Sequence, residues 1–248
     1  MSIFLTGDTH GKLERLSNTN FKKNFGREAN KDDVMIILGD FGCIWNPASK
    51  WHTKETHYLD TFSEHLKGTL LVVLGNHENY DMIEALPVVE RYGAECYQVR
   101  DNIFIVKNGE VAEIEGKKFF VFGGATSIDK QNREEFISWW SQEVPNCATM
   151  DKGIQAIEDN ECRFDYILTH QMPIQALKEL TTALERKYMR LECPVMHYLT
   201  EIHEMIDFKK WYMGHWHMNQ KKGKYHCLYD DIIELKTNKV VKNQVIHI

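Results

Sequence analysis

Five short apolar runs occur along the chain, and each is followed by glycine or by a polar residue. The runs are 2–6, 34–38, 70–74, 166–169 and 211–213. Short β-rich runs of this kind predict buried strands that lead into tight loops. In open α/β sheets, ligands collect beyond the carboxyl ends of the strands. The pattern therefore predicts that side chains far apart in the sequence converge on one place.

The segments between these runs predict an α/β fold. In the first half, strands alternate with helices at 52–67 and 79–86, which favours adjacent parallel strands. The polar stretch 12–30 has no clear period and predicts no element. The middle of the chain predicts short strands joined by turns such as Asn108-Gly109, a hairpin signal. Together the elements predict two mixed β-sheets packed face to face, with helices outside.

The remaining elements follow from the same patterns of apolar positions and turn residues. The further predicted strands are 96–99, 103–106, 111–114, 118–122, 164–169, 208–213, 224–228, 232–235 and 244–248, and the further predicted helices are 133–141, 150–160 and 195–206.

Composition limits the class of protein. The 248 residues contain no Pro-, Gly- or Ser-rich linker, so we expect one domain spanning 1–248. A net charge of −6 argues against a general affinity for nucleic-acid backbone. The first residues lack the pattern of a signal peptide, and no apolar run reaches the roughly 18 residues of a membrane span. The six cysteines are dispersed and predict reduced thiols, so we expect a cytoplasmic protein without a membrane partner.

Residues able to bind metal ions follow each of the five runs. They are Asp8, His10, Asp40, Asn76, His170, His215 and His217. Asp8 and His10 lie two positions apart just past a strand, where residues i and i+2 point to the same side, so one ion can take both. One Gly-Asp after a strand is usually only a turn. Five such signals in order favour a shared metal site.

These donors divide into two sets around one carboxylate. The sets are Asp8, His10 and His217 for one ion, and Asn76, His170 and His215 for the other. Asp40 then bridges both ions, because a carboxylate offers two oxygens. A mixed nitrogen and oxygen set suits Mn, Fe, Zn or Ni, and we expect two divalent ions, with Mn²⁺ favoured. His77 lies outside both sets and could bind a phosphate oxygen or protonate a leaving oxygen.

In this order, the motifs resemble those of the calcineurin-like metallophosphoesterase superfamily. They read Gly7-Asp8-Thr9-His10, Gly39-Asp40, Gly75-Asn76-His77-Glu78, His170 and Gly214-His215-Trp216-His217. The resemblance spans residues 7–217 and fills every ligand position. It implies a four-layer αββα sandwich with a two-metal site at the strand ends. It also implies attack by a metal-bridging hydroxide, with His77 as the catalytic histidine and general acid.

The second motif distinguishes between branches of that superfamily. Serine/threonine phosphatases continue it as Gly-Asp-x-x-Asp-Arg-Gly, and the arginine that would hold a monoester phosphate is absent here. Gly39-Asp40-Phe41 with Asn46, and the segments 123–127 and 168–173, look more like RNA lariat debranching enzymes. Trp45 stands where that pattern has Arg, and Asp8 where many of those enzymes have Cys. The resemblance implies a shared sub-branch rather than a shared substrate.

Three residues are candidates for substrate binding. Lys130 and Arg133 follow the Gly-Gly loop and precede Trp139-Trp140, so cations near aromatic rings could receive a phosphate and a stacked base. The alternative is a surface helix whose tryptophans pack into the core. Trp45 could form an apolar wall of the pocket.

Three functions remain open at this stage. Phosphodiester hydrolysis is favoured, on a phosphate ester such as a nucleotide or a nucleic-acid end. The alternative is a phosphomonoesterase for phosphoprotein or a small metabolite. The third is a scaffold without turnover, against which the complete ligand set argues. The sequence indicates no oligomeric state.

Overall fold

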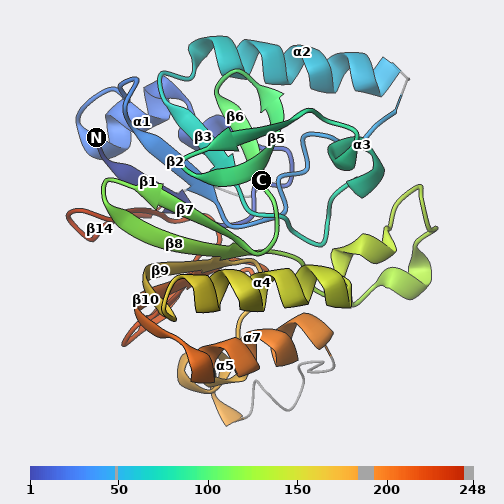
Figure 1. Cartoon of the computed structure of the whole chain (residues 1–248). Coiled ribbons are helices and arrows are strands. Elements are labelled where there is room, and N and C mark those ends of the chain that lie inside the picture. The colour runs from blue at the N-terminus through green and yellow to red at the C-terminus, as the bar shows by residue number, and fades with distance from the viewer. Residues whose placement is uncertain (48–49, 184–192, 243–248) are drawn as a thin grey trace.

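The computed structural model of the chain describes residues 1–47, 50–183 and 193–242. In this part of the chain, two β-sheets pack face to face and helices cover the outer face of each sheet (Figure 1). This is the four-layer α/β arrangement that the sequence predicts.

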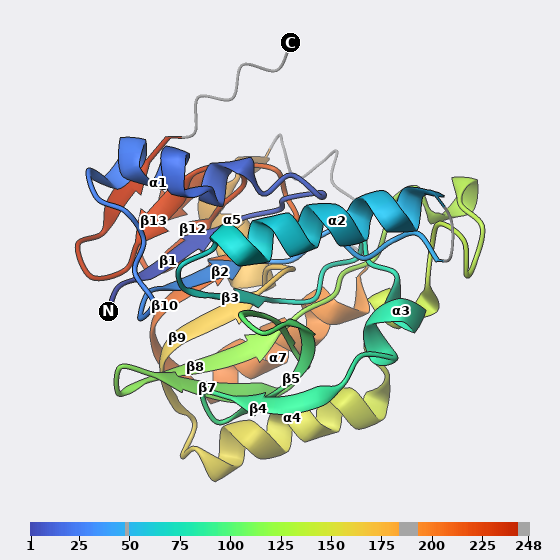
Figure 2. The same cartoon turned by 90° about the horizontal axis from the view of Figure 1, so that it is seen from above.

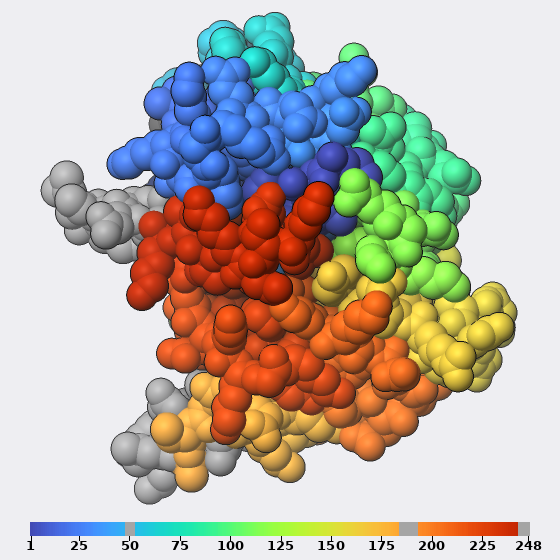
Figure 3. Space-filling view, turned by 90° about the vertical axis from the view of Figure 1, so that its left-hand side faces the viewer, coloured from blue at the N-terminus to red at the C-terminus, as the bar shows by residue number. Residues whose placement is uncertain are grey.

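The first sheet has the strand order β14-β13-β1-β2-β3-β6-β5-β4. Its strands are β1 (Ile3–Thr6), β2 (Val34–Ile37), β3 (Thr69–Val72), β4 (Val88–Arg91), β5 (Ala94–Arg100), β6 (Ile103–Val106), β13 (Ile232–Glu234) and β14 (Lys239–Val241). The neighbours β1, β2, β3 and β6 are parallel, and Thr6, Ile37 and Val72 lie level with one another. The carboxyl ends of these strands therefore meet at one edge. Figure 3 shows the C-terminal segments, in red, against the N-terminal ones, in blue.

The second sheet has the order β11-β12-β10-β9-β8-β7. Its strands are β7 (Glu110–Ile114), β8 (Lys117–Phe122), β9 (Arg163–Thr169), β10 (Asp207–Met213), β11 (Gln220–Lys222) and β12 (Tyr225–Cys227). Strands β8, β9 and β10 are parallel, with Phe122, Thr169 and Met213 in register. The view from above shows how the central strands of the molecule run in a common direction (Figure 2).

Helices form the two outer layers. Those against the first sheet are α1 (Asn18–Phe25) and α2 (Lys50–His65); those against the second are α4 (Cys147–Asp159), α5 (Ile174–Leu180) and α7 (Pro194–Met205) (Figure 1). The short helix α3 (Tyr80–Glu84) follows the loop after β3, and single 3-10 turns lie at η1 (Glu14–Leu16), η2 (Lys130–Asn132) and η3 (Ser141–Glu143). In the described residues, no helix is long and apolar enough to cross a membrane.

Alternation along the strands produces three apolar cores between the four layers. Phe4 packs against Phe21 of α1, with ring centroids 4.7 Å apart. Its neighbours Ile3 and Leu5 belong to the core shared with the second sheet. A third core lies between the second sheet and α4, α5 and α7. Central strands buried on both faces read as continuous apolar runs, which is why the sequence reveals them.

The predicted helix 133–141 is wrong. The segment forms a tight turn in which the carbonyl of Glu134 accepts hydrogen bonds from the backbone N–H groups of Ile137, Ser138 and Trp139. Trp140 then enters the first core, 2% exposed, and its indole N–H donates to Asp81 at 2.9 Å. A tertiary contact thus overrides the helical pattern, although one of the two tryptophans does pack into the core, as the alternative interpretation expected.

Other differences concern short or exposed elements. The stretch 12–30, which predicted no element, contains η1 and α1. Strands β4, β11 and β14 and helix α5 were not predicted, and β11 is exposed throughout. The predicted strand 244–248 lies outside the described residues.

Candidate metal centre

The candidate ligands lie at the carboxyl ends of parallel strands from both sheets. Asp8, Asp40 and Asn76 follow β1, β2 and β3 of the first sheet, while His170 and His215 follow β9 and β10 of the second. The register of the parallel strands places these loops level with one another. The two sheets therefore supply one shared site.

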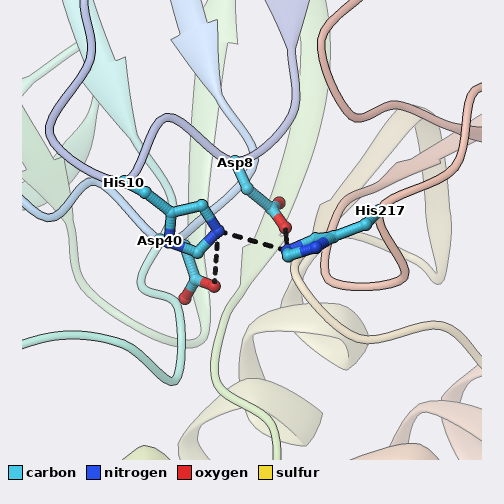
Figure 4. A group of neighbouring side chains, drawn as sticks. All are labelled: Asp8, His10, Asp40 and His217. Atoms are coloured by element: carbon cyan, nitrogen blue, oxygen red, sulfur yellow. Dashed lines mark hydrogen bonds and ion pairs between the residues drawn. The ribbon is translucent and has the colours of Figure 1, made fainter. Parts of the chain in front are cut away.

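One set of donors converges on the solvent side of this site. Asp8, His10, Asp40 and His217 each offer a ligand atom, and these atoms all lie within 4.8 Å of one another (Figure 4). The Nε2 atoms of His10 and His217 are 3.1 Å apart, and His217 Nε2 lies 3.0 Å from Asp8 Oδ2. Both histidine side chains are partly exposed, so a substrate can reach this set.

A second set lies deeper, around the fully buried His170. Its Nδ1–H donates to the carbonyl oxygen of Leu38 at 2.7 Å, because a carbonyl can only accept. Its Nε2 faces Asn76 Oδ1 at 2.9 Å and Asp40 Oδ1 at 3.3 Å. In a neutral imidazole with Nδ1 protonated, Nε2 carries a lone pair. The lone pairs of His170 Nε2, Asn76 Oδ1 and Asp40 Oδ1 therefore face one another.

The charges around His170 favour a cation at this point. Burial lowers the pKa of His170, but the negative charges of Asp40 and Asp8 outweigh burial and raise the pKa to about 9. The carboxylates therefore favour a positive charge between these lone pairs, from a proton or from a metal ion.

Asp40 lies between the two sets and presents one oxygen to each. Its Oδ1 faces His170, while its Oδ2 lies 3.8 Å from His10 Nε2. Oδ1 also accepts the backbone N–H of His77 at 2.8 Å, and the residue is only 1% exposed. The carboxylate is thus fixed in an orientation suited to bridging two ions.

His215 lies beside the deeper set. Its ring is 5.0 Å from that of His170, at 64° to it, and its backbone N–H donates to Asp8 Oδ1 at 3.0 Å. Burial lowers the pKa of His215 to about 3, and the positive charge of His170 acts in the same direction. The ring is therefore a neutral base, the form that binds metal ions.

The loops hold the ligands in backbone conformations that are rare for residues with a side chain. His10, Asp40, His215 and His217 all have positive φ, between 45° and 68°. Such conformations persist only where the surroundings determine them, and they cluster at functional sites. The close approach of neighbouring loops adds a second constraint: a Cβ at Gly39 would lie 2.1 Å from His170 Nδ1.

The residues present fit two metal ions. Within the described residues, Asp8 Oδ2 is buried and accepts no hydrogen bond, although His217 Nε2 is near. Donors bound to one ion at about 2.1 Å lie roughly 3.0–3.4 Å apart, depending on the angle between them. Two separations in each set, at 2.9 to 3.3 Å, agree with this range, while His10 Nε2 and Asp40 Oδ2 lie farther apart, at 3.8 Å. Imidazole and carboxylate donors suit Mn, Fe, Zn or Ni.

His77 lies at the rim of the site. Its ring is 5.7 Å from that of His10. Burial lowers the pKa of His77, and the positive charge of Arg133 adds to this, while Asp40 acts in the opposite direction. The guanidinium of Arg133 is held by Asp129 at 2.8 Å and by the carbonyl of Ser138 at 3.0 Å.

The other two substrate-binding candidates are Lys130, in the same loop as Arg133, and Trp45. Lys130 Nζ is 6.0 Å from the ring centroid of Trp139, at the limit of a cation–π contact. Trp45 is half-buried against Trp140, with ring centroids 5.4 Å apart. The contacts do not bring either residue to the metal ligands. A separate surface cavity of about 550 Å³ contains Tyr97 and Lys152 but none of the candidate ligands.

Several residues that support the ligands were not identified from the sequence. Glu78 is 1% exposed and accepts the backbone N–H of Phe41 at 2.7 Å, directly after Asp40. Arg15 donates to the carbonyl of Asp8 at 2.7 Å, and the ring of Tyr229 stacks on His217 at 4.5 Å. Glu78 could have been found, because it ends the Gly-Asn-His-Glu motif. Arg15 and Tyr229 carry no signal in the sequence.

Comparison with known proteins identifies the family. The profile described as "Calcineurin-like phosphoesterase" matches residues 1–219. A search of curated proteins gives no match. Among solved structures, the chain is similar to a 5'-nucleotidase precursor from Thermus thermophilus, with 14% identity and a TM-score of 0.40. The alignment covers 97% of this chain and 47% of that chain, so this chain spans about half of the other's length. The match to the profile covers most of the chain, including every candidate ligand, and the chain belongs to the calcineurin-like phosphoesterase family.

Proposed function

We propose that the protein hydrolyses phosphoric diesters at a two-metal centre formed by Asp8, His10, Asp40, Asn76, His170, His215 and His217. Hydrolysis of phosphoric esters is the activity of its family. The observation that carries the proposal is the position of Asp40, whose two oxygens face two separate donor sets. When bound there, two cations supply Lewis acidity and lower the pKa of a water molecule, the usual role of such pairs.

The chain's own residues then have distinct tasks. Asp40 holds the two sites together and is oriented by the N–H of His77. The exposed side chains of His10 and His217 leave the outer site open to an incoming ester. His77, beside His10, donates a proton to the leaving oxygen or a hydrogen bond to a phosphoryl oxygen. Arg133 adds a positive charge at the same rim.

The preference for diesters rests on the second motif. Ile44 and Trp45 stand near the place where related phosphatases carry the arginine that holds a monoester dianion, and Trp45 packs as an apolar side chain. Neither residue supplies a positive charge for the extra negative charge of a monoester dianion, so their presence here favours the diester. Nucleotides and nucleic-acid ends are among the substrates that we propose, because their units are joined by phosphodiesters.

A specific observation favours the phosphomonoesterase alternative. Arg133 is only 21% exposed at its side chain, is anchored by Asp129, and its charge reaches His77. A guanidinium so placed could hold the extra charge of a monoester.

The deciding experiment compares kcat/KM for bis(nitrophenyl) phosphate, nitrophenyl phosphate and a 2',5'-linked dinucleotide in saturating Mn²⁺. We expect the diesters to be preferred, and Arg133→Ala to change this preference little. Lys130→Ala is the matched control, because it removes a cation from the same loop. A preference for the monoester that is lost in Arg133→Ala but kept in Lys130→Ala would replace the proposal with the monoesterase.

A further inference from the structure

Glu143 is a buried carboxylate away from the metal ligands. It ends the 3-10 turn η3, is 1% exposed, and shows no ion pair within the described residues. Burying a carboxylate is costly unless hydrogen bonds satisfy it. Here both oxygens accept from one residue: Oε1 from the backbone N–H of Ser127 at 2.9 Å, and Oε2 from its hydroxyl.

These contacts determine the direction of a hydrogen-bond chain that ends at a metal ligand. The hydroxyl of Ser127 has a single hydrogen, and a carboxylate can only accept, so that hydrogen goes to Glu143. Ser127 Oγ must therefore accept the side-chain N–H of Asn76, whose Nδ2 lies 2.9 Å away. The amide nitrogen of Asn76 is thereby assigned to the side facing Ser127.

The assignment leaves the amide oxygen on the opposite side. Asn76 Oδ1 faces His170 Nε2 at 2.9 Å, in the deeper donor set. If the amide rotated by 180°, its NH₂ group would face the ion, and its oxygen would face Ser127 Oγ. The single hydroxyl hydrogen of Ser127 would then have two acceptors, Asn76 Oδ1 and Glu143 Oε2, and could serve only one of them. All three residues are buried, so water cannot repair the mismatch.

We propose that Glu143, acting through Ser127, is a positioning residue that keeps the amide oxygen of Asn76 directed at the deeper metal site. This inference rests on the proposed two-metal function and adds to it a specific requirement for one of the two ions. The outer set of Asp8, His10 and His217 makes no contact with this chain of hydrogen bonds among the described residues.

The test replaces the carboxylate with an amide of the same size. In Glu143→Gln, the new NH₂ group donates to Ser127 Oγ, so the serine hydrogen turns toward Asn76 and favours the rotated amide. We expect the affinity of one of the two Mn²⁺ ions to fall by about 10–100-fold, the usual effect of losing a group that orients a ligand. Calorimetric titration and Mn²⁺ electron paramagnetic resonance measure both affinities without an activity assay.

A double-mutant cycle separates positioning from general support of the fold. Ser127→Ala should lower the affinity for the same ion. Adding Glu143→Gln to it should lower that affinity by less than a further 2-fold, because the effects of residues acting through one path are not additive. Thr126→Ala is the matched control, since its hydroxyl contacts Cys193 rather than Asn76, and it should bind both ions normally. If Glu143→Gln does not fold, Ser127→Ala alone gives the test.

Each negative outcome has its own meaning. Wild-type protein that binds fewer than two Mn²⁺ ions would overturn the proposed function. If the wild-type protein binds two ions and Glu143→Gln binds both with unchanged affinity, only the role of Glu143 is overturned. Where Glu143→Gln does not fold, unchanged affinities in Ser127→Ala have the same meaning. Additive losses in the cycle would also overturn it, because they would indicate a structural effect.

Discussion

The geometry of the site is tested most directly by adding a single methyl group at Gly75. This glycine lies between β3 and Asn76, and a Cβ placed on it would be 2.1 Å from Asp40 N and 2.2 Å from Asp40 Oδ1. Its φ is not among the positive values, so alanine is disfavoured by lack of space and not by backbone strain. Gly75→Ala therefore acts directly on the bridging carboxylate.

The size of the effect follows from these distances. Contacts of a Cβ below 3.0 Å are essentially never observed, so the contact at 2.1 Å must open by about 0.9 Å. A shift of this size directed away from His77 would break the hydrogen bond that Asp40 Oδ1 accepts from the His77 N–H, now 2.8 Å long. A misplacement of about 1 Å in a catalytic group can cost roughly 10²-fold in rate. We expect a loss of this order in kcat/KM, with reduced metal content.

The assay measures bis(nitrophenyl) phosphate hydrolysis in saturating Mn²⁺, together with Mn per chain by elemental analysis. Gly93→Ala is the control, because its φ of 79° carries strain but its Cβ would meet nothing within 4 Å. That variant should lose about 1 kcal/mol of stability and keep its activity. Wild-type turnover and two bound ions in Gly75→Ala would refute the packing of Asp40 against Gly75.

Three further predictions concern proton transfer, metal binding and stability. His77→Ala should keep both ions and lower kcat by about 10²–10⁴-fold for poor leaving groups, with a smaller loss for nitrophenolate; equal losses would leave His77 only a phosphate-positioning role. Removing metal with a chelator should lower the melting temperature, and Mn²⁺ at 100 times its Kd should restore about 2.7 kcal/mol of the free energy of unfolding. The same restoration in Asp40→Asn would contradict the assignment of Asp40 as the bridge. Asp33→Ala removes a buried carboxylate that accepts from Arg27 at 2.6 Å and from two backbone N–H groups, so it should cost at least about 2 kcal/mol, whereas the exposed Asp32→Ala should be neutral. Burial raises the pKa of Asp33 less than Arg27 and the N–H groups lower it. The stability that ionised Asp33 contributes is thus fully present above pH about 4 and is lost as pH falls through the pKa of Asp33 in the folded state. Urea unfolding should therefore show a smaller destabilisation by Asp33→Ala at pH 3 than at pH 7. An equal destabilisation at both pH values would contradict a role for the ionised carboxylate.

The candidate ligands could be brought together from the sequence because the strands that they follow are buried on both faces. Such strands are continuous apolar runs, and their parallel pairing brings the ends together. The order of the runs was therefore enough to place Asp8, Asp40 and His170 near one another. It did not show which oxygen of Asp40 faces which donor set, since that depends on the positive φ of Asp40 and on the space left by Gly75.

Three kinds of feature could not be predicted from the sequence, for physical reasons. The segment 133–141 has helical residues, but the burial of Trp140 and its bond to Asp81 favour a turn, which leaves Phe136 62% exposed. Edge strands such as β11 are short and polar, so no alternation reveals them. Supporting residues such as Glu143 act across the fold, and a single carboxylate in a loop looks like any other exposed acid until its burial is known.

The proposed ligand sets each draw on both sheets. In the outer set, Asp8 and His10 come from the first sheet and His217 from the second; in the deeper set, Asn76 comes from the first and His170 from the second. The separation of the sheets, fixed by the core that contains Leu5, Val121 and Leu168, therefore determines the distances within both sets. A cation bound to either set joins the two sheets. The same apolar runs that reveal the strands thus also set the geometry of the candidate metal centre, because the core that they form holds the two halves of each donor set together.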